Sequence, residues 1–229
     1  MLGPGQRLDR FVVEAEIGRG GFGTVYRARH EVLGTKVALK VLNADRAHDA
    51  EHVERLFREA RAATAIGSPH IAKVVDAGRS MGGMPFLAME LLEGEDLADL
   101  MQSRLRLSIG ETMALARQLL SGLGAAHAAG IVHRDLKPAN VFVAREGGRV
   151  VVKILDFGIS KMSGSVLTAA GMVLGTPAYM APEQLLDARA AEPRSDLYAA
   201  AAIVYQMLAG TLPWPAGGLP DLSRRAAGD

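Results

Sequence analysis

The chain has 229 residues, which is long enough for one or two hydrophobic cores. Its 49% hydrophobic and 22% charged residues are ordinary for a globular protein, and a net charge of +1 gives no support for nucleic acid as a partner. The absence of cysteine excludes disulfides and thiolate metal sites and agrees with a cytoplasmic location. Residues 1–10 lack the apolar core of a signal peptide, and the apolar run 197–209 is too short to cross a bilayer. We therefore expect no membrane segment in this chain.

A glycine-rich stretch comes first along the chain. Residues 17–25 contain the pattern G-x-G-x-x-G-x-V, and glycines let a backbone approach phosphate oxygens closely. A dinucleotide-binding fold has the same glycine spacing, but there a helix follows the glycines directly. Here residues 24–29 alternate as in a β-strand, and residues 37–42 form a further predicted strand. The pattern therefore predicts a glycine turn in a β-hairpin, with Lys40 on the next strand.

Residues 49–65 have the periodicity of an amphipathic helix. Apolar side chains recur there at three- and four-residue steps, at Val53, Leu56, Phe57 and Ala60. Glu59 lies in this segment. A lysine that holds a phosphate needs a carboxylate to fix its flexible stem, and Glu59 is the best candidate for that ion pair with Lys40. The alternative is that Glu59 is a solvated charge on the helix.

Two motifs farther along the chain supply the remaining groups for phosphoryl transfer. Residues 133–140 read His-Arg-Asp-Leu-Lys-Pro-Ala-Asn, and residues 156–158 read Asp-Phe-Gly. Asp135 can accept a hydroxyl proton, and Lys137 can neutralise phosphate charge. Asn140 and Asp156 can offer oxygen ligands to a metal ion. Each short motif could arise by chance, but the ordered set points to a phosphoryl-transfer site.

In combination, these motifs resemble those of eukaryotic-type serine/threonine protein kinases, and the Ala- and Gly-rich style is similar to bacterial members. The resemblance runs from about Phe11 to about Pro215. It implies an α+β fold with two lobes, β-rich and mainly helical, that bind ATP with Mg²⁺ in the cleft between them. The implied division is an N-terminal extension at 1–10, an N-lobe with hinge at 11–92, a C-lobe at 93–216 and a tail at 217–229. The implied reaction is phosphorylation of serine and threonine hydroxyls on protein substrates.

The resemblance also implies which residues bind the nucleotide. They are Ile17, Gly18, Arg19, Gly20, Gly21, Phe22, Gly23, Thr24, Val25, Ala38, Lys40, Met89, Glu90, Leu92, Asp96 and Phe142. Met89 would lie beside the adenine pocket, with backbone groups of Glu90 and Leu92 bonding the base. Phe142 stands at the position that would form the floor of the adenine pocket, where the family more often has leucine. Asp96 either accepts from a ribose hydroxyl or simply caps a helix, and the sequence does not decide between the two.

The catalytic residues implied by the resemblance are Lys40, Glu59, Asp135, Lys137 and Thr176, and the implied magnesium ligands are Asn140 and Asp156. Thr176 is expected to hydrogen-bond near the catalytic loop and to help select hydroxyl substrates. Ala139 stands where relatives that prefer basic sequences often have glutamate. The sequence therefore gives no reason to expect an arginine beside the phosphoacceptor.

A regulatory site is also implied. Arg134 and Lys161 are two cations expected to face a loop that contains Thr168, which suggests a phosphothreonine pocket. We expect activation by phosphorylation of Thr168, in trans between two copies that form a transient homodimer. The alternative is that Ser163 or Ser165 is the modified residue.

Two departures from the family pattern bear on stability. Ala201 stands where the family usually has glycine, and a methyl group at a tight helix contact costs about 1–3 kcal/mol. After Trp214 the family continues with further helices, so we expect a truncated chain in which Glu183 is a buried carboxylate without its arginine. Leaving a buried carboxylate without its cationic partner costs about 3–5 kcal/mol in the free energy of unfolding. The truncation would also uncover one face of the 197–209 helix, and we expect the chain by itself to be marginally stable.

Two alternatives to an active kinase follow from these departures. The chain could be a catalytically silent binding module with a kinase fold, or an inactive truncated remnant. Silent modules usually lack Lys40, Asp135 or Asp156, and all three are present here. The residues with direct chemical roles therefore favour a kinase.

Overall fold

The computed structural model describes residues 2–21, 23–157 and 177–214, which divide into two units. The N-terminal unit comprises residues 1–65 and 72–93, and the C-terminal unit comprises residues 66–71 and 94–229. Segment 66–71 differs from the predicted division. It belongs to the C-terminal unit because the Ile154 backbone N–H donates to the His70 carbonyl at 2.8 Å, and Ile71 forms a parallel bridge with Ile154.

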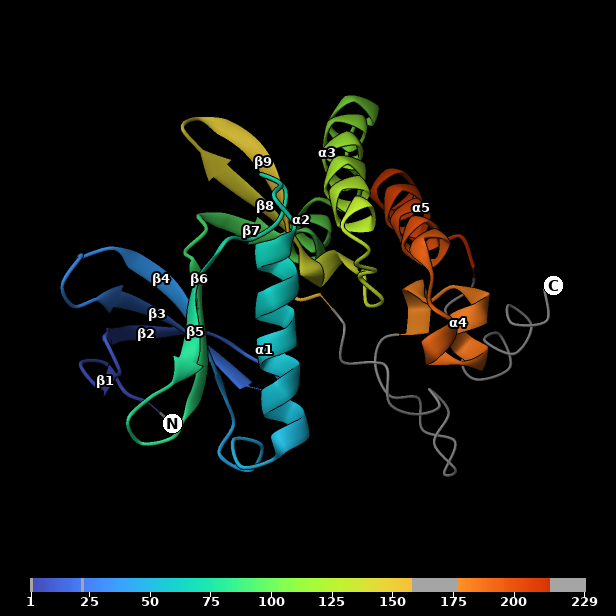
Figure 1. Ribbon diagram of the computed structural model, residues 1–229. Coiled ribbons are helices and arrows are strands. Elements are labelled where there is room, and N and C mark those ends of the chain that lie inside the picture. The colour runs from blue at the N-terminus through green and yellow to red at the C-terminus, as the bar shows by residue number, and fades with distance from the viewer. Residues whose placement is uncertain (1, 22, 158–176, 215–229) are drawn as a thin grey trace. The chain divides into compact units, whose positions relative to one another are not determined.

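The N-terminal unit is an antiparallel sheet of six strands in the order β1-β2-β3-β4-β6-β5, with one helix, α1, beside β5 and β6 (Figure 1). Its elements are β1 Arg7–Leu8, β2 Phe11–Arg19, β3 Gly23–His30, β4 Lys36–Leu42, α1 Ala50–Ala65, β5 Val74–Arg79 and β6 Pro85–Glu90. The predicted hairpin, the strand that carries Lys40 and the helix that carries Glu59 are confirmed.

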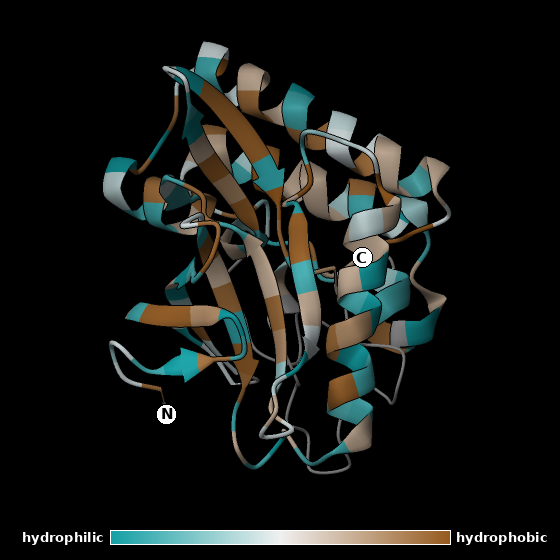
Figure 2. Cartoon of the chain, turned by 60° about the vertical axis from the view of Figure 1, so that its left-hand side comes forward, coloured by the Kyte–Doolittle hydropathy of each residue, from teal (hydrophilic) through white to brown (hydrophobic). Residues whose placement is uncertain are grey.

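Strand β4 shows why this sheet has two different faces. Val37, Leu39 and Val41 are buried in the main core of the unit, whereas Ala38 and Lys40 point to the other face and are half-buried. Alternate residues of a strand point to opposite faces, and Figure 2 shows this alternation as changes of hydropathy along the strands. Helix α1 packs against this other face, where a second core contains side chains of α1, β4 and β6.

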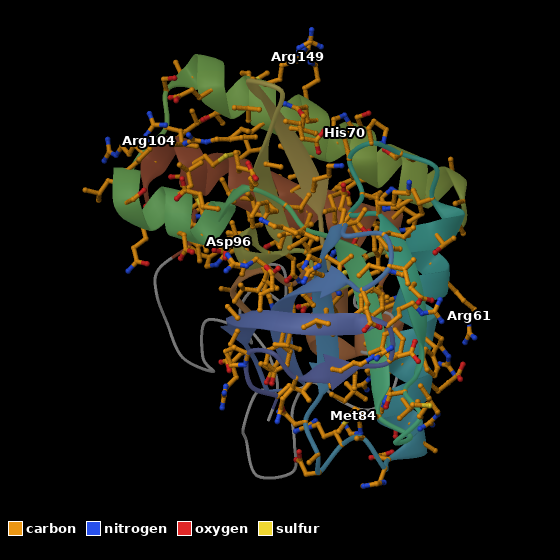
Figure 3. The ribbon with its side chains drawn as sticks, turned by 90° about the vertical axis from the view of Figure 1, so that its left-hand side faces the viewer. Arg61, His70, Met84, Asp96, Arg104 and Arg149 are labelled. Carbon is orange, nitrogen blue, oxygen red and sulfur yellow. The ribbon has the colours of Figure 1, made fainter. Side chains whose placement is uncertain are left out.

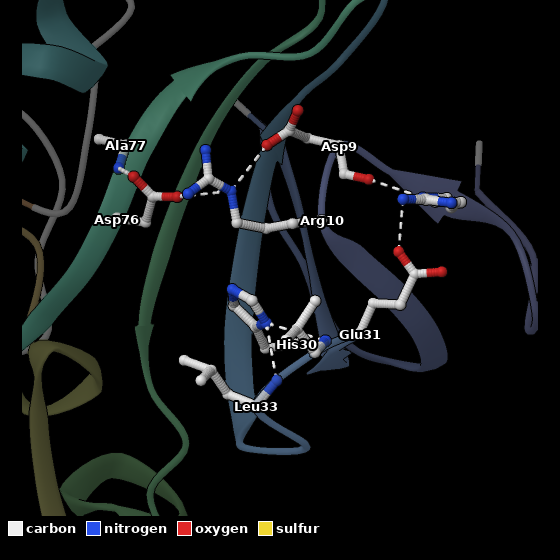
Figure 4. Close-up of polar contacts among 9 residues, drawn as sticks. Asp9, Arg10, His30, Glu31, Leu33, Asp76 and Ala77 are labelled. Carbon is white, nitrogen blue, oxygen red and sulfur yellow. Dashed lines mark hydrogen bonds and ion pairs between the residues drawn. The ribbon is translucent and has the colours of Figure 1, made fainter.

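Surface ion pairs connect the β1–β2 turn to β5 (Figure 4). The Arg10 Nε lies 3.0 Å from Asp9 Oδ2 and 3.5 Å from Asp76 Oδ2. The hydrogen bond from Arg10 to Asp9 raises the pKa of the arginine. Arg10 is exposed, whereas the Asp9 and Asp76 side chains are half-buried. Because water still reaches the guanidinium group, such pairs contribute little to stability.

The C-terminal unit contains a small sheet, β7-β8-β9, and most of the helices (Figure 1). Its elements are β7 Gly94–Asp96, α2 Leu97–Arg104, α3 Ile109–Ala128, η1 Pro138–Asn140, β8 Val141–Glu146, β9 Arg149–Ile154, η3 Pro177–Tyr179, α4 Pro182–Leu186, η4 Ala188–Ala190 and α5 Pro193–Ala209. The α+β fold, with one β-rich and one mainly helical part, is confirmed. Within the described residues, no helix is both long and apolar enough to cross a membrane.

Side-chain caps define where the helices of this unit begin. Asp96 caps α2 by accepting from the backbone N–H groups of Ala98 and Asp99, and Figure 3 labels Asp96 and Arg104 at its two ends. Ser108 and Glu111 form a reciprocal capping box at the start of α3. Each such cap satisfies N–H groups that have no partner within the helix.

Helix α5 is only partly covered. Leu197, Tyr205 and Leu208 are 48%, 47% and 40% exposed, which confirms the expectation of an uncovered face. Ala201 lies on the same face and is exposed. The expectation of a tight contact at Ala201 is therefore wrong, because a residue in a tight packing contact would not be exposed.

Candidate active site

The glycine loop is the turn between β2 and β3. Arg19 pairs with Thr24 across the two strands, and the Gly20 N–H donates to the Gly23 carbonyl at 2.9 Å. A Cβ atom at Gly23 would lie 2.4 Å from the Val41 carbonyl oxygen, so only glycine fits there. Apart from its two chain neighbours, no described residue comes within 4 Å of a Cβ built at Gly21. Close packing thus explains why residue 23 is glycine, whereas the surroundings of Gly21 have room for a side chain. Phe22 lies outside the described residues.

Lys40 and Glu59 form the expected ion pair within the N-terminal unit. The Lys40 Nζ lies 3.2 Å from Glu59 Oε2, and the two side chains are only 14% and 13% exposed. Because water is largely excluded, the carboxylate restricts the lysine more strongly than a surface partner would.

Three apolar residues share the sheet face of Lys40. Val25 is directly opposite Lys40 on β3, and Ala38 is opposite Met89 on β6. Directly opposed residues of antiparallel strands lie on the same face. The N-terminal unit therefore places the predicted adenine contacts Val25, Ala38 and Met89 on one half-buried surface with the lysine. Glu90, at the end of β6, is tied to Lys73 by its backbone N–H and its carboxylate.

The 133–140 loop brings three predicted groups together in the C-terminal unit. The Lys137 Nζ lies 3.1 Å from Asp135 Oδ2. The Asn140 Nδ2 donates to the Asp135 carbonyl at 2.8 Å, which directs the amide oxygen of Asn140 away from that carbonyl. Asn140 is buried, whereas the Asp135 and Lys137 side chains keep 20% and 27% of their surface exposed. The carboxylate and the amine therefore remain accessible to a substrate.

The segment that carries Asp156 is attached to this loop. The Leu155 N–H donates to the Asn140 carbonyl at 2.9 Å, and the Leu155 carbonyl accepts from His133 Nε2 at 2.9 Å. Asp156 is exposed and has a positive φ of 44°, a conformation that costs energy for a residue with a side chain. Neighbouring hydrogen bonds thus hold Asp156 close to Asn140 in the chain's fold.

His133 is packed inside the C-terminal unit. Its ring is fully buried, lies 5.0 Å from the Phe157 ring centroid and accepts from the Asp135 N–H. Burial lowers the pKa of His133 despite the nearby Asp196 carboxylate, so the imidazole is neutral at pH 7. The neutral imidazole can donate from Nε2 to the Leu155 carbonyl and accept at Nδ1 from the Asp135 N–H, as the two hydrogen bonds require.

Asp196, on α5, holds the backbone of the 133–140 loop. This carboxylate is 2% exposed and accepts from the His133 N–H at 2.8 Å and the Arg134 N–H at 2.9 Å. His127 Nε2 contacts the same carboxylate at 2.7 Å. These bonds tie α5 to the backbone of the loop, and His127 is a further partner of the same carboxylate.

Gln184 is a second holding residue that sequence reasoning missed. It is buried, and its Nε2 donates to the Arg134 carbonyl at 3.0 Å while its Oε1 accepts from the Ala181 N–H at 3.2 Å. Arg134 has a φ of 68° and therefore depends on such partners. No local pattern identifies Gln184, because its partner lies 50 residues earlier in the chain.

Arg134 leaves one polar atom unsatisfied in the described part of the chain. Its Nη1 is buried and has no hydrogen-bond partner there. A buried N–H of this kind is costly unless it meets an acceptor. The predicted phosphorylation site that would supply this acceptor lies outside the described residues, with Thr168, its alternatives Ser163 and Ser165, and the neighbouring cation Lys161. The predicted catalytic Thr176 also lies outside them.

Asp96 and Phe142 are directly opposed on β7 and β8. The capping interpretation of Asp96 is confirmed by its two bonds to the start of α2, at 2.9 and 3.0 Å. Its contact with a ribose, and the place of Phe142 beneath the base, stay predictions.

The expectation for Glu183 is wrong. Its carboxylate is only half-buried, and its Oε1 accepts from the Ser195 hydroxyl at 2.5 Å. The carboxylate is therefore neither sealed from water nor without a partner. The predicted penalty for a buried unpaired charge does not apply.

The residues of the C-terminal unit fit a magnesium ion. Asn140 and Asp156 offer an amide and a carboxylate oxygen, which are the hard ligands that Mg²⁺ takes. Protein sites for Mg²⁺ with nucleotides commonly use one or two such groups and complete the shell with phosphate and water. Within the described residues, no group of three or more His, Cys, Asp or Glu could hold a metal ion by itself.

The chain is similar to known protein kinases. The family model described as protein kinase domain matches residues 11–224. Pkn3 of Myxococcus xanthus, a serine/threonine-protein kinase, is 43% identical over 90% of this chain and 38% of its own length. The serine/threonine-protein kinase PknL of Mycobacterium bovis is 41% identical over 90% of this chain and 51% of its own length. The chain thus spans about a third to a half of these curated relatives.

A solved structure agrees with the sequence relatives. The kinase domain of PknI from Mycobacterium tuberculosis superposes with a TM-score of 0.74 at 30% identity, covering 99% of this chain and 86% of that domain. The match extends through the glycine loop, the 133–140 loop and α5. The chain belongs to the protein kinase domain family.

Proposed function

We propose that the protein transfers the γ-phosphate of ATP to serine and threonine hydroxyls of proteins. The observation that carries the proposal is the 3.1 Å contact between Lys137 and Asp135 in a loop that Asp196 fixes from α5. An accessible carboxylate beside an accessible amine can receive a hydroxyl proton and stabilise the phosphoryl group that the hydroxyl attacks. The similarity to named serine/threonine kinases supports the same chemistry.

The chain's residues divide the reaction between them. Asp135 orients the hydroxyl and accepts its proton while the oxygen forms a bond to the γ-phosphorus and the bond to the β-phosphate bridging oxygen breaks, releasing ADP. Lys137 neutralises charge on the transferred group. Lys40, restrained by Glu59, holds the other phosphates, and the open space at Gly21 leaves room for them. Asn140 and Asp156 would hold Mg²⁺, which neutralises phosphate charge when bound.

Regulation through the 158–176 segment is part of this proposal. The buried Arg134 nitrogen that lacks a partner in the described residues would be satisfied by a phosphate oxygen on Thr168. We place the modification in trans, between two transiently associated copies in the cytoplasm. Activation would then depend on protein concentration, and Thr168→Ala would remove it while Ser163→Ala and Ser165→Ala would not.

The direct test uses a generic protein substrate such as casein. The wild-type chain with ATP and Mg²⁺ should produce phosphoserine or phosphothreonine, identified by mass spectrometry, and Asp135→Asn should produce none above background. The exposed Asp99→Asn serves as a matched control and should retain activity. Stabilisation by Mg-ATP without any transfer would instead indicate a silent binding module.

A further inference from the structure

Three polar side chains contact one another in series at the turn between β4 and α1, within the N-terminal unit (Figure 1). The Arg46 Nη1 lies 2.9 Å from His52 Nε2, and His52 Nδ1 lies 2.7 Å from Asp49 Oδ2. Arg46 and Asp49 belong to the turn, whereas His52 is the third residue of α1. The Arg46 and His52 side chains are 32% and 21% exposed, so water reaches this turn network only in part.

Asp49 uses its two carboxylate oxygens for different purposes. Its Oδ1 accepts from the Glu51 N–H at 2.8 Å, and its backbone carbonyl accepts from the Val53 N–H at 3.1 Å, as expected of a residue that caps a helix. Its Oδ2 binds His52. The hydrogen bond from His52 lowers the pKa of Asp49, so this carboxylate is ionised at pH 7 and can only accept.

The two partners of His52 fix its protonation state. Because the Asp49 carboxylate can only accept, the Nδ1 atom of His52 must carry the proton of that bond. Because the Arg46 guanidinium can only donate, the Nε2 atom must be without a proton and accept from it. Only the neutral Nδ1–H form of the imidazole satisfies both contacts. A second proton would place two donors and two positive charges at the 2.9 Å contact with Arg46.

Arg46 connects the turn network to β4. Its backbone N–H donates to the Asn43 carbonyl at 2.9 Å, and Asn43 directly follows β4, the strand that carries Lys40. On the other side of the contact, His52 belongs to α1, the helix that carries Glu59. The contact between Arg46 and His52 therefore ties the strand of the lysine to the helix of its carboxylate partner.

Other charged groups near His52 make contacts of their own. Asp45 Oδ2 lies 3.8 Å from Arg46 Nε, and on α1 the Arg55 Nη2 lies 3.6 Å from Glu51 Oε1. The strands that pack against α1 contribute three further charged side chains, each in contact with a group other than His52: Asp76 and Arg79 on β5 and Glu90 on β6. A cation in the first turn of a helix also opposes the helix dipole. A second proton on His52 thus meets Arg46 most directly and disfavours the start of α1.

We propose that His52, acting through Arg46, is a positioning residue for the use of ATP. In its neutral form, His52 holds the start of α1 to the end of β4. A second proton on the ring releases Arg46 and loosens α1, which weakens the restraint that Glu59 places on Lys40. This inference rests on the proposed kinase function for its effect on ATP, whereas the state of the turn network is testable without it.

Steady-state kinetics with varied ATP and casein tests the effect on nucleotide use. Between pH 7.5 and pH 6.0 we expect the wild-type KM for ATP to rise by about fivefold, the scale of a lost helix cap. His52→Gln can still donate to Asp49 and accept from Arg46 but takes no second proton, so its KM should not share this rise. His48→Gln is the matched control, because His48 is exposed on the same turn, and it should keep the wild-type rise. The same rise in His52→Gln as in the wild type overturns the inference.

Nuclear magnetic resonance separates this inference from the proposed reaction. Ring nitrogen signals should show neutral His52 with its proton on Nδ1 at pH 7.5. Protection of the Glu51 and Val53 amides from hydrogen exchange should then fall by about fivefold once the ring takes its second proton. Arg46→Gln removes the opposing charge, so its protection should not fall as the ring is protonated.

That pattern supports the inference even if casein is not phosphorylated, in which case the proposed reaction alone is wrong. A proton on Nε2 at pH 7.5, or wild-type protection that stays constant as His52 is protonated, overturns the inference. An equal fall in Arg46→Gln overturns it as well. Thermal unfolding of each variant verifies that it is folded.

Discussion

The Arg134 backbone N–H donates to the buried Asp196 carboxylate at 2.9 Å, across 62 residues of sequence. Arg134 has a φ of 68°, which is unfavourable for a residue with a side chain. Its carbonyl is held as well, by Gln184 at 3.0 Å. Residues of α4 and α5 thus fix the peptide groups on both sides of Arg134, and Asp135 follows directly. The position of the proposed catalytic base depends on these two helices.

Removing the Asp196 carboxylate should therefore destabilise the C-terminal unit. Asp196→Ala leaves the His133 and Arg134 N–H groups buried without an acceptor, and we expect a loss of about 3–5 kcal/mol in the free energy of unfolding. Chemical denaturation measures this loss. The exposed Asp45→Ala is the control and should change stability by less than about 0.5 kcal/mol. A change at Asp196 as small as that of the control would contradict the anchoring role.

Two glycines of one loop should respond differently to alanine. Gly23→Ala forces a Cβ against the Val41 carbonyl oxygen, so we expect a loss of stability of about 1–3 kcal/mol or more. Gly21→Ala adds a methyl group that meets none of the described residues beyond its chain neighbours, and it should leave the unfolding midpoint unchanged. It should instead weaken ATP binding, measured by calorimetry, because the methyl group occupies space that the proposal gives to phosphate. Unchanged ATP affinity in Gly21→Ala would argue against that use of the space.

The Lys40–Glu59 pair should matter more for nucleotide use than any surface pair on α1. Glu59→Gln removes the charge that restrains Lys40, and we expect kcat/KM for ATP to fall by about 100-fold, as when a group that stabilises transferred charge is lost. Glu54→Gln on the same helix is the matched control, because Glu54 is exposed and pairs only with surface arginines in the described residues. Steady-state kinetics with varied ATP distinguishes them. Equal effects of the two substitutions would exclude a special role for Glu59.

The lowered pKa of His133 predicts an acid-sensitive fold. Because the folded chain holds this imidazole neutral, the unfolded chain binds more protons once the pH falls below its ordinary pKa of 6.5. The stability that the neutral, buried His133 contributes is therefore fully present above pH 6.5. Below this pH the free energy of unfolding decreases as the pH falls toward the lowered pKa of His133. Thermal unfolding between pH 7.5 and pH 5.5 measures it, and His133→Gln should reduce this slope. An identical slope in the variant would assign the acid sensitivity to other groups.

The sequence predicted those parts of the site that depend on local pattern. Alternation in β4 placed Lys40 on a strand, and helical periodicity placed Glu59 on a helix. Their ion pair was expected because a lysine that holds a phosphate needs a carboxylate partner, and the structure confirms it. The cap at Asp96 was one of two open interpretations. The hydrogen bonds that its side chain accepts confirm the cap, and the ribose contact stays a prediction.

Features that depend on tertiary packing were missed or wrong. Ala201 is exposed and Glu183 accepts from Ser195, and neither fact can be read from residue type. The contact of Gln184 with the Arg134 carbonyl joins segments that lie 50 residues apart in the chain. Only the assembled unit brings such residues together.

The most direct test of the central claim is transfer from γ-labelled ATP with and without Mg²⁺. We predict labelled protein with the wild-type chain and Mg²⁺, loss of label on chelation, and loss of label in Asp156→Asn even at saturating Mg²⁺. The Asp156→Asn protein should remain folded, because this side chain is exposed. Equal labelling by the wild-type and Asp156→Asn chains would show that the label comes from another enzyme or another site, and the account would be wrong.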